Sequence, residues 1–433
     1  MVATESELRD KECTALFPAI RPIFLTLRIL HTADLHLDSP LRSLALKDDR
    51  LAAQVRDASR HALETMVQYC IDEDVAAFLI AGDLYDGQER SAKTAAYLAG
   101  QMQRLADAGV QVFYIKGNHD AENPIAGEIA LPANVHVFDG KGGMVQLGDH
   151  PVYIQGVSFR GRHAPDSLLP KYKAPVPGAV NIAMMHTSLM GAAGHDPYAP
   201  CSVAELAQTD FDYWALGHVH KRQVHGQNPW IVMPGMPQGR DIGEAGPKSA
   251  SILTVQDGQI DVSELPTSLL EFRACECVLD GVETDDDVRD ALRGCLKAEA
   301  GRGAAILRLR LTGQTTMAWR LRQLADYWQA EIAQMAENIG GLWLEKLILD
   351  VSPPSATGTD SAVGEIEQLM HEVATSPASR ENLGKELDQM LALLPAERRR
   401  ELVPDEAAQD ALLTRLTDDA ILSMVAKMRG QGE

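Results

Sequence analysis

The sequence predicts a layered α/β sandwich, followed by a smaller α/β domain and a C-terminal helical tail. Two patterns support this fold class. Between residues 27 and 264, short apolar runs typical of strands alternate with helix-like stretches and polar turns. Beyond this range the alternation continues only to residue 352, and residues after 364 keep helical spacing alone. The expected units are an arm at 1–26, a first domain at 27–264, a second domain at 265–352, a linker at 353–364 and helices at 365–433.

The first domain opens with a βαβαβ series, which favours a mainly parallel sheet with helices on its faces. Strands are expected at 27–34, 75–83 and 110–118, and helices at 51–74 and 91–109. Later strand-like runs are more closely spaced, so we expect more antiparallel pairing there. They lie at 135–138, 152–159, 180–187, 211–218, 230–235 and 251–256.

The second domain is expected to be a small α/β unit. Its strands are predicted at 272–282, 304–313 and 342–352, and its helices at 284–300 and 318–337. A linker rich in Pro, Gly, Ser and Thr follows. The tail has apolar stripes at helical spacing, which must be buried on this chain or on another one.

Composition describes an ordinary globular protein of 433 residues, with 45% hydrophobic and 23% charged residues. The formal net charge of −21 argues against a broad cationic surface. Any binding of nucleic acid must therefore depend on a local patch, bound metals or a partner. No apolar run is as long as a membrane span and no signal-peptide core is present, so we expect a cytoplasmic protein without membrane contact.

Six cysteines are scattered along the chain. Cys275 and Cys277 are separated by one residue in a strand-like run, where neighbouring side chains alternate faces, so we do not expect them to share a zinc ion. We expect reduced, structural thiols.

Polar side chains follow five of the predicted strands. The motifs are DLH at 34–36, GDLYD at 82–86, GNHD at 117–120, HTS at 186–188 and GHVH at 217–220. Loops at the ends of strands converge in open α/β sheets, and positions i and i+2 point to one side. Carboxylate, amide and imidazole ligands suit Mn²⁺, Fe²⁺, Zn²⁺ or Co²⁺. The pattern therefore predicts a metal site.

Each motif alone has a simpler explanation. The role of Gly117 and Asn118 could simply be to end a strand, and Asp86 could cap a helix. A single DxH or GHxH motif is in most cases a chance match or a turn. Five such motifs in order, each at the end of a strand, favour the metal site.

The ordered motifs resemble the signature of the calcineurin-like metallophosphoesterases. The resemblance implies two divalent metal ions, with Mn²⁺ expected first, and a water between them that attacks phosphorus. It implies His119 as a catalytic imidazole that Asp120 orients. The implied metal ligands are Asp34, His36 and His220 for one ion, Asn118, His186 and His218 for the other, and Asp83 between the two.

Within that superfamily, the stretches HTADLHLDSP, GDLYD and PGMPQGRDIGE resemble DNA repair exonucleases of the SbcD/YhaO type. The resemblance implies a DNA substrate, a capping second domain, a homodimer and a coiled-coil ATPase partner of the SbcC/YhaN type that docks on the tail. Asp38 and Asp86 depart from the archaeal and eukaryal pattern, where Gly and a second His are usual. Arg240 is interpreted either as a phosphate contact or as a surface salt bridge.

Two other functions fit parts of the sequence. A small-molecule or lipid phosphodiesterase would use the same metal site, but it would not need a second domain and a tail. A non-catalytic scaffold would be expected to have lost ligands, and all of the implied ligands are present.

Overall fold

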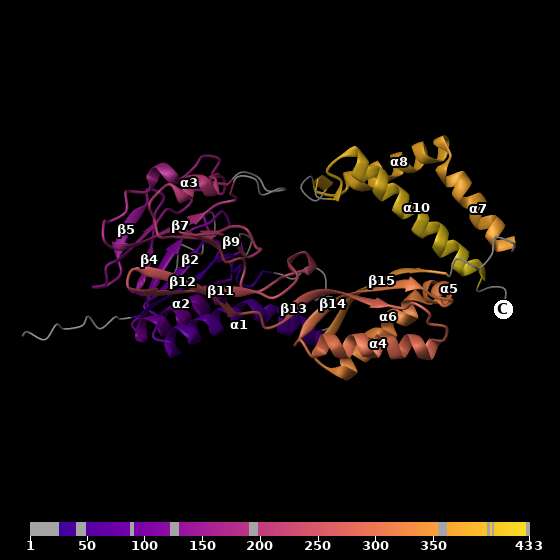
Figure 1. The fold of residues 1–433 in the computed structure, drawn as a ribbon, viewed down its shortest axis with the longest axis horizontal. Coiled ribbons are helices and arrows are strands. Elements are labelled where there is room, and N and C mark those ends of the chain that lie inside the picture. Colours follow the sequence, from indigo (N-terminus) through magenta and orange to yellow (C-terminus); the bar gives the residue numbers. More distant parts are fainter. Residues whose placement is uncertain are drawn as a thin grey trace, which may run out of the picture.

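The structure is a computed structural model that describes residues 26–39, 49–86, 91–121, 130–189, 198–353, 362–395, 399–400 and 402–429. Most of the predicted N-terminal arm and most of the predicted linker lie outside these residues. The described part of the chain forms a two-sheet core, a three-stranded middle domain and a group of C-terminal helices (Figure 1).

The first sheet of the core has the strand order β12-β11-β1-β2-β3-β4. Strands β1 to β4 pair in parallel, whereas β11 pairs antiparallel with both β1 and β12. The expected βαβαβ start is confirmed. Its elements are β1 (Leu27–Thr32), α1 (Asp49–Asp72), β2 (Ala77–Ala81), α2 (Ala92–Asp107), β3 (Gln111–Ile115), β4 (Val135–Val137), β11 (Ser249–Gln256) and β12 (Gln259–Pro266).

The second sheet has the order β5-β6-β7-β8-β10-β9. The expected antiparallel pairing of the later strands occurs at β11 and β12 of the first sheet and at the two edges of the second sheet, whereas β6, β7, β8 and β10 pair in parallel. Its strands are β5 (Gly143–Gln146), β6 (Val152–Gly156), β7 (Val180–His186), β8 (Tyr213–Gly217), β9 (Gln223–Gln227) and β10 (Trp230–Met233). The short helices η2 (Leu169–Lys171), α3 (Val203–Ala207) and η3 (Ile242–Glu244) lie in its connections.

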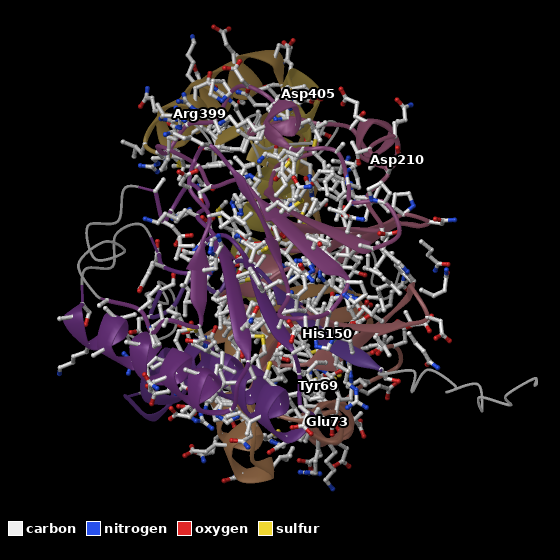
Figure 2. All side chains as sticks on the ribbon, turned by 90° about the vertical axis from the view of Figure 1, so that its left-hand side faces the viewer. Tyr69, Glu73, His150, Asp210, Arg399 and Asp405 are labelled. Carbon is white, nitrogen blue, oxygen red and sulfur yellow. The ribbon has the colours of Figure 1, made fainter. Side chains whose placement is uncertain are left out.

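The predicted layered sandwich is confirmed. One apolar cluster fills the space between the sheets and includes Ile29, Leu79 and Ile182. A second cluster packs α1 and α2 on the outer face of the first sheet, and a third covers the outer face of the second sheet. Figure 2 views this core from the end that faces away from the middle domain, where His150 lies.

The middle domain is a parallel sheet of order β13-β14-β15 with its helices packed on one face. The single helix expected at 318–337 was wrong, since the structure has two helices that meet at Leu324. Leu321 of α5 and Trp328 of α6 both enter the core of this domain. Its elements are β13 (Glu271–Val278), α4 (Asp285–Ala300), β14 (Ala305–Gln314), α5 (Ala318–Gln323), α6 (Ala325–Ile339) and β15 (Leu342–Ser352).

The expectation for Cys275 and Cys277 also needs correction. Residues at i and i+2 of a strand share a face, and both side chains point from β13 toward α4, where they join the same apolar cluster. All five cysteines within the described residues are free thiols.

The tail consists of α7 (Ala362–Thr375), α8 (Pro377–Ala392) and α10 (Glu406–Arg429). These helices pack on one another, and α10 also contacts α5, at the end of the middle domain that faces away from the core (Figure 1). Ile421 and Val425 of α10 are buried, whereas Leu369 and Leu416 stay exposed. Within the described residues, no helix has the length and apolar character needed to cross a membrane.

Candidate metal centre

The five predicted motifs meet where the carboxyl ends of the two sheets come together. The first sheet supplies Asp34 and His36 after β1, Asp83 after β2 and Asn118 after β3. The second sheet supplies His186 at the end of β7, with His218 and His220 after β8. Three overlapping groups have ligand atoms within 4.8 Å of one another: Asp34 with His36 and His220, His36 with Asp83 and His119, and Asp83 with His186 and His218. The structure thus brings together all seven side chains that were expected to hold metals.

Short distances join the two sheets at this point. His36 Nε2 lies 3.2 Å from His220 Nε2, and His186 Nε2 lies 3.1 Å from Asn118 Oδ1. The backbone N–H of His218 donates to both carboxylate oxygens of Asp34, at 3.1 and 3.0 Å. Each half of the centre therefore contains side chains from both sheets.

The glycines before the ligands are required for close approach. A Cβ on Gly117 would lie 2.2 Å from Asp83 Oδ1, and one on Gly217 would lie 2.0 Å from the carbonyl oxygen of Ala81. Gly82 has φ of +97°, and a Cβ there would lie 2.3 Å from His186 Nδ1. No other residue type fits these positions without displacing a ligand.

Several ligands themselves have left-handed backbone, which is rare for residues other than glycine. The φ values are 53° for Asp34, 42° for His36, 51° for Asp83 and 102° for His218. Such strained residues persist only where surrounding contacts fix them, and they cluster at functional sites.

The hydrogen bonds of His186 show that the donor set suits a cation. Its Nδ1 lies 2.9 Å from the carbonyl oxygen of Ala81, so this nitrogen must carry the proton of the neutral ring. The lone pair of Nε2 then faces Asn118 Oδ1 at 3.1 Å and Asp83 Oδ2 at 3.4 Å, both of which are acceptors. When this ring is neutral, three acceptors face one another, an arrangement that a cation between them relieves. A divalent metal ion fits this position.

The surroundings shift the pKa values of Asp34 and Asp83 in opposite directions. Burial raises the pKa of Asp34 to about 6, although His186 and His220 oppose the effect. Burial also works against ionisation of Asp83, but His186, His36 and His119 outweigh it and hold the pKa of Asp83 well below its usual range. Asp83 is therefore a firmly ionised carboxylate at the middle of the centre, in contact with groups from both sides.

Glu244 holds the ring of His220 by a hydrogen bond at Nδ1. Its Oε1 lies 2.8 Å from His220 Nδ1, which sets the tautomer and leaves Nε2 for a metal. Arg240 Nη2 lies 2.7 Å from the same Glu244 oxygen and 3.2 Å from His220 Nδ1. Arg240 thus forms a salt bridge, one of its two expected roles, but this bridge lies beside a ligand rather than on an unrelated surface. The sequence offered no sign of Glu244 as a partner of His220.

His119 and Asp120 differ in their surroundings. His119 Nδ1 lies 3.6 Å from Asp86 Oδ1, and Asp86 in turn accepts a 2.9 Å hydrogen bond from the Ser39 hydroxyl. Asp120 was expected to orient His119. Instead it accepts backbone hydrogen bonds from Leu84, Tyr85 and Gly117 at 3.0–3.2 Å. It therefore joins the GDLYD and GNHD loops, and Asp86 is the carboxylate placed to orient the imidazole. Asp86 is the last residue of the GDLYD motif, but the sequence did not predict this role for it.

Aromatic rings line the side of the centre formed by the second sheet. Phe159 meets the ring of His186 edge-on, with 5.5 Å between centroids, and Tyr198 lies 4.9 Å from the ring of His218. Phe159 was expected at the end of the strand at 152–159 but lies in the loop after β6, and Tyr198 also lies in a loop. They shield one face of the imidazoles from solvent and leave the side of His119 more open.

Comparison with known proteins agrees with this geometry. Residues 27–222 match the family model for the calcineurin-like phosphoesterases, and residues 272–352 match the model for the middle domain of metallophosphoesterase YhaO. By this match, residues 27–222 form a calcineurin-like phosphoesterase domain. More particularly, the chain has the YhaO type of middle domain after its core.

Several curated relatives are similar over about half of the chain or more. Metallophosphoesterase YhaO of Bacillus subtilis (strain 168) is 34% identical over 239 residues, which is 54% of this chain and 59% of that protein. The DNA double-strand break repair protein Mre11 of Haloferax volcanii is 25% identical over 297 residues, covering 66% of this chain and 62% of that one. A component of nuclease SbcCD from Bacillus subtilis is 26% identical over 275 residues, covering 54% and 67%. The chain thus spans about three fifths of the length of the first two relatives.

Proposed function

We propose that this protein is a two-metal phosphodiesterase that cuts DNA and processes DNA ends in repair. The observation that carries the proposal is the convergence of seven ligand side chains from two sheets on one centre, with His119 at its more open side. Asp34, His36 and His220 would hold one ion, and Asn118, His186 and His218 the other, with Asp83 in contact with both. The donor set is compatible with Mn²⁺, our first choice, and with Fe²⁺, Zn²⁺ or Co²⁺.

When bound, such an ion pair supplies Lewis-acid chemistry, polarising phosphoryl oxygens and activating a water molecule. The protein's own contribution is position. Glu244 and the carbonyl of Ala81 fix the rings of His220 and His186, and the glycines before the ligands let the two sheets approach closely. These contacts exist before substrate binds, so little reorganisation is needed during the reaction.

His119 is the group we assign to proton transfer at the departing oxygen. Burial lowers its pKa, but the hydrogen bond to Asp86 and the charge of Asp83 outweigh burial and raise it overall. The imidazole is therefore more often protonated near neutral pH than a free one. Its Nδ1 faces Asp86, and we assign proton donation to the leaving group to Nε2.

The position of the middle domain supports a large substrate. Ile242, two residues before Glu244, packs against the apolar cluster that contains Phe272 and Ile306 of the middle domain. The middle domain is thus linked to a ligand of the centre through a short helical turn. The names of the Mre11 and SbcCD relatives describe DNA repair and nuclease proteins, which agrees with a polymeric phosphodiester as substrate.

The test is a direct comparison of substrates. Purified protein with Mn²⁺ is incubated with end-labelled duplex DNA, with single-stranded DNA and with bis(4-nitrophenyl) phosphate, and Asp83→Asn serves as the inactive control. Cleavage of DNA that chelator abolishes would support the nuclease. Cleavage of the small diester alone would favour a small-molecule enzyme, and ion binding without hydrolysis would indicate a scaffold.

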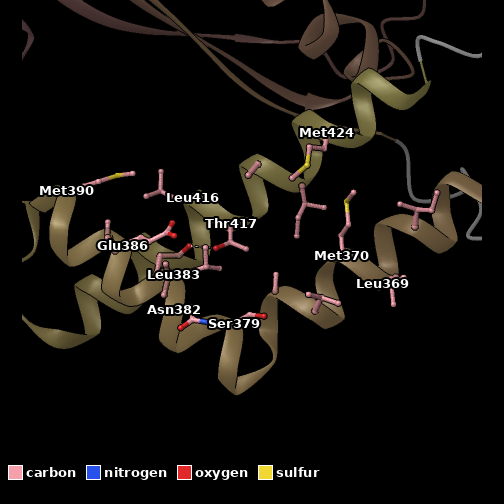
Figure 3. A pocket seen from close by; sticks show the side chains of 17 residues that line it. Leu369, Met370, Ser379, Asn382, Leu383, Glu386, Met390, Leu416, Thr417 and Met424 are labelled. Atoms are coloured by element: carbon pink, nitrogen blue, oxygen red, sulfur yellow. Dashed lines mark hydrogen bonds between the residues drawn. The ribbon is translucent and has the colours of Figure 1, made fainter.

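For the partner, we propose that a coiled-coil ATPase docks on the tail. A groove of about 740 Å³ runs between α7, α8 and α10 and is mostly apolar (Figure 3). Leu369 is 59% exposed and Leu416 46% exposed, and methionines such as Met370 and Met424 also line the groove. An amphipathic helix fits such a groove, and methionine side chains adapt to it. The name of the SbcCD relative shows that it is one part of a complex.

A further inference from the structure

Three thiols of the middle domain meet at one place, away from the metal centre. Cys275 and Cys277 point from β13 toward α4, and Cys295 of α4 lies between them. Cys295 Sγ lies 3.7 Å from the carbonyl oxygen of Glu276, the residue that separates the other two cysteines. All three cysteine side chains belong to one apolar cluster of the middle domain.

This arrangement differs from that of the two buried core cysteines. Burial raises the pKa of Cys70, and burial also raises the pKa of Cys201, so both remain unreactive thiols. Cys295 is only half-buried, and its neighbours Cys275 and Cys277 lower the pKa of its thiol. Reactivity requires access, and Cys295 is more accessible than either core cysteine.

We propose that Cys295 is an oxidation site that forms a disulfide with Cys275 or Cys277. A peroxide first oxidises the Cys295 thiolate to a sulfenic acid and is reduced to water. The thiol of Cys275 or Cys277 then attacks this sulfur, a sulfur–sulfur bond forms and a second water leaves. The third cysteine can attack the Cys295 sulfur of that disulfide, which moves the bond from one strand cysteine to the other and frees the first as a thiol.

The bond would tie α4 to β13, an edge strand of the middle-domain sheet. Only the short turn before α4 and most of that helix separate the cysteines in sequence. Oxidation would therefore fix the packing of α4 without crossing to the core or to the tail. The proposal does not depend on the phosphodiesterase activity.

The experiment uses the full chain with Cys13→Ser, so that the one cysteine outside the described residues cannot contribute. The protein is treated with hydrogen peroxide, alkylated with iodoacetamide, digested with trypsin and analysed by mass spectrometry. Trypsin cuts after Arg273, Arg289, Arg293 and Lys297, so Cys275 and Cys277 leave on one peptide and Cys295 on another. We expect a disulfide between these two peptides, and no such bond at Cys70 or Cys201.

Variants separate the alternatives. Cys275→Ser should move the bond to Cys277, Cys277→Ser should leave it on Cys275, and Cys295→Ser should abolish it. Circular dichroism confirms that each variant is folded. A bond between Cys275 and Cys277 within one peptide would overturn the role of Cys295. So would alkylation of Cys295 in the untreated protein no faster than alkylation of Cys70.

Discussion

Glu244 and His220 are joined by a 2.8 Å hydrogen bond that holds one ligand of the metal centre in a single orientation. Arg240 shares the same carboxylate, and together His220 and Arg240 hold the pKa of Glu244 well below its usual range despite the burial of this group. The pair is therefore a charged support for a neutral imidazole.

We expect Glu244→Gln to weaken metal binding by about 10- to 100-fold, because the amide supports the imidazole less strongly and leaves Arg240 without its charge partner. Calorimetric titration of Mn²⁺ into metal-free protein measures this. Glu264→Gln is the matched control, since Glu264 pairs with Arg222 at 3.1 Å and contacts none of the ligands. Equal affinities for Glu244→Gln and the unchanged protein would contradict the role of Glu244.

His119→Ala should keep both ions but lower kcat by about 10²- to 10⁴-fold, which corresponds to about 3–5 kcal/mol of barrier. Elemental analysis of the bound metal accompanies the kinetics. His150→Ala is the control, because His150 lies at the end of the core that faces away from the middle domain (Figure 2). Loss of an ion from His119→Ala would instead make His119 a ligand, as its proximity to His36 and Asp83 allows.

Asp86→Asn and Asp120→Asn should fail in different ways. Asp86 faces His119, so its variant should lower kcat and add little to the loss seen in His119→Ala. Asp120 accepts three backbone hydrogen bonds, so its variant should lower the free energy of unfolding by about 1–3 kcal/mol. Kinetics and urea unfolding of both variants are compared. If Asp120→Asn changed kcat alone, Asp120 would be the residue that orients His119.

Gly217→Ala should disrupt the centre, because the new Cβ would collide with the carbonyl oxygen of Ala81 and press on His186 Nδ1. We expect weaker metal binding and a loss of about 1–3 kcal/mol in stability. Gly100→Ala is the opposite case. It lies exposed within α2 with no atom within 4 Å of the added Cβ, so it should raise stability by about 0.5–1 kcal/mol. Urea unfolding measures the change in the free energy of unfolding for both variants. An unchanged stability of Gly217→Ala would show that the two sheets can separate at low cost.

Charges placed in the tail groove should block the partner without changing the enzyme. Leu369→Glu and Leu416→Glu alter exposed side chains, so hydrolysis of the small diester should stay unchanged while copurification with the coiled-coil ATPase is lost. Val278→Glu on the middle domain has similar exposure, 57%, and should bind the ATPase normally. Continued copurification of both groove variants would place the docking surface elsewhere.

Sequence patterns predicted the parts of this protein that depend on neighbouring residues. Apolar runs marked most of the strands, and polar motifs at their ends marked the seven side chains that the structure brings together. The strands β5, β9 and β12 were not predicted. Strands β5 and β9 have few apolar residues, and the apolar residues of β12 alternate with polar ones in a largely exposed strand.

Contacts between distant residues could not be predicted in this way. Glu244 reaches His220 because a helical turn returns to the end of β8, and Asp86 reaches His119 because two loops lie side by side. The interruption at Leu324 has no signal in the sequence, because the apolar spacing of Leu321 and Trp328 is that of one continuous helix. Arg240 could be read as a phosphate contact or a salt bridge until its neighbours were known.

The division of the ligands between the two sheets has a mechanical consequence. An ion held by Asp34 and His220, or by Asn118 and His186, would connect a side chain of the first sheet to one of the second sheet. A small separation of the layers would lengthen the bonds to such an ion long before either sheet lost its own hydrogen bonds. Release of the ions would then be the earliest sign that the sandwich is loosening, and tight retention would show that its layers remain in register.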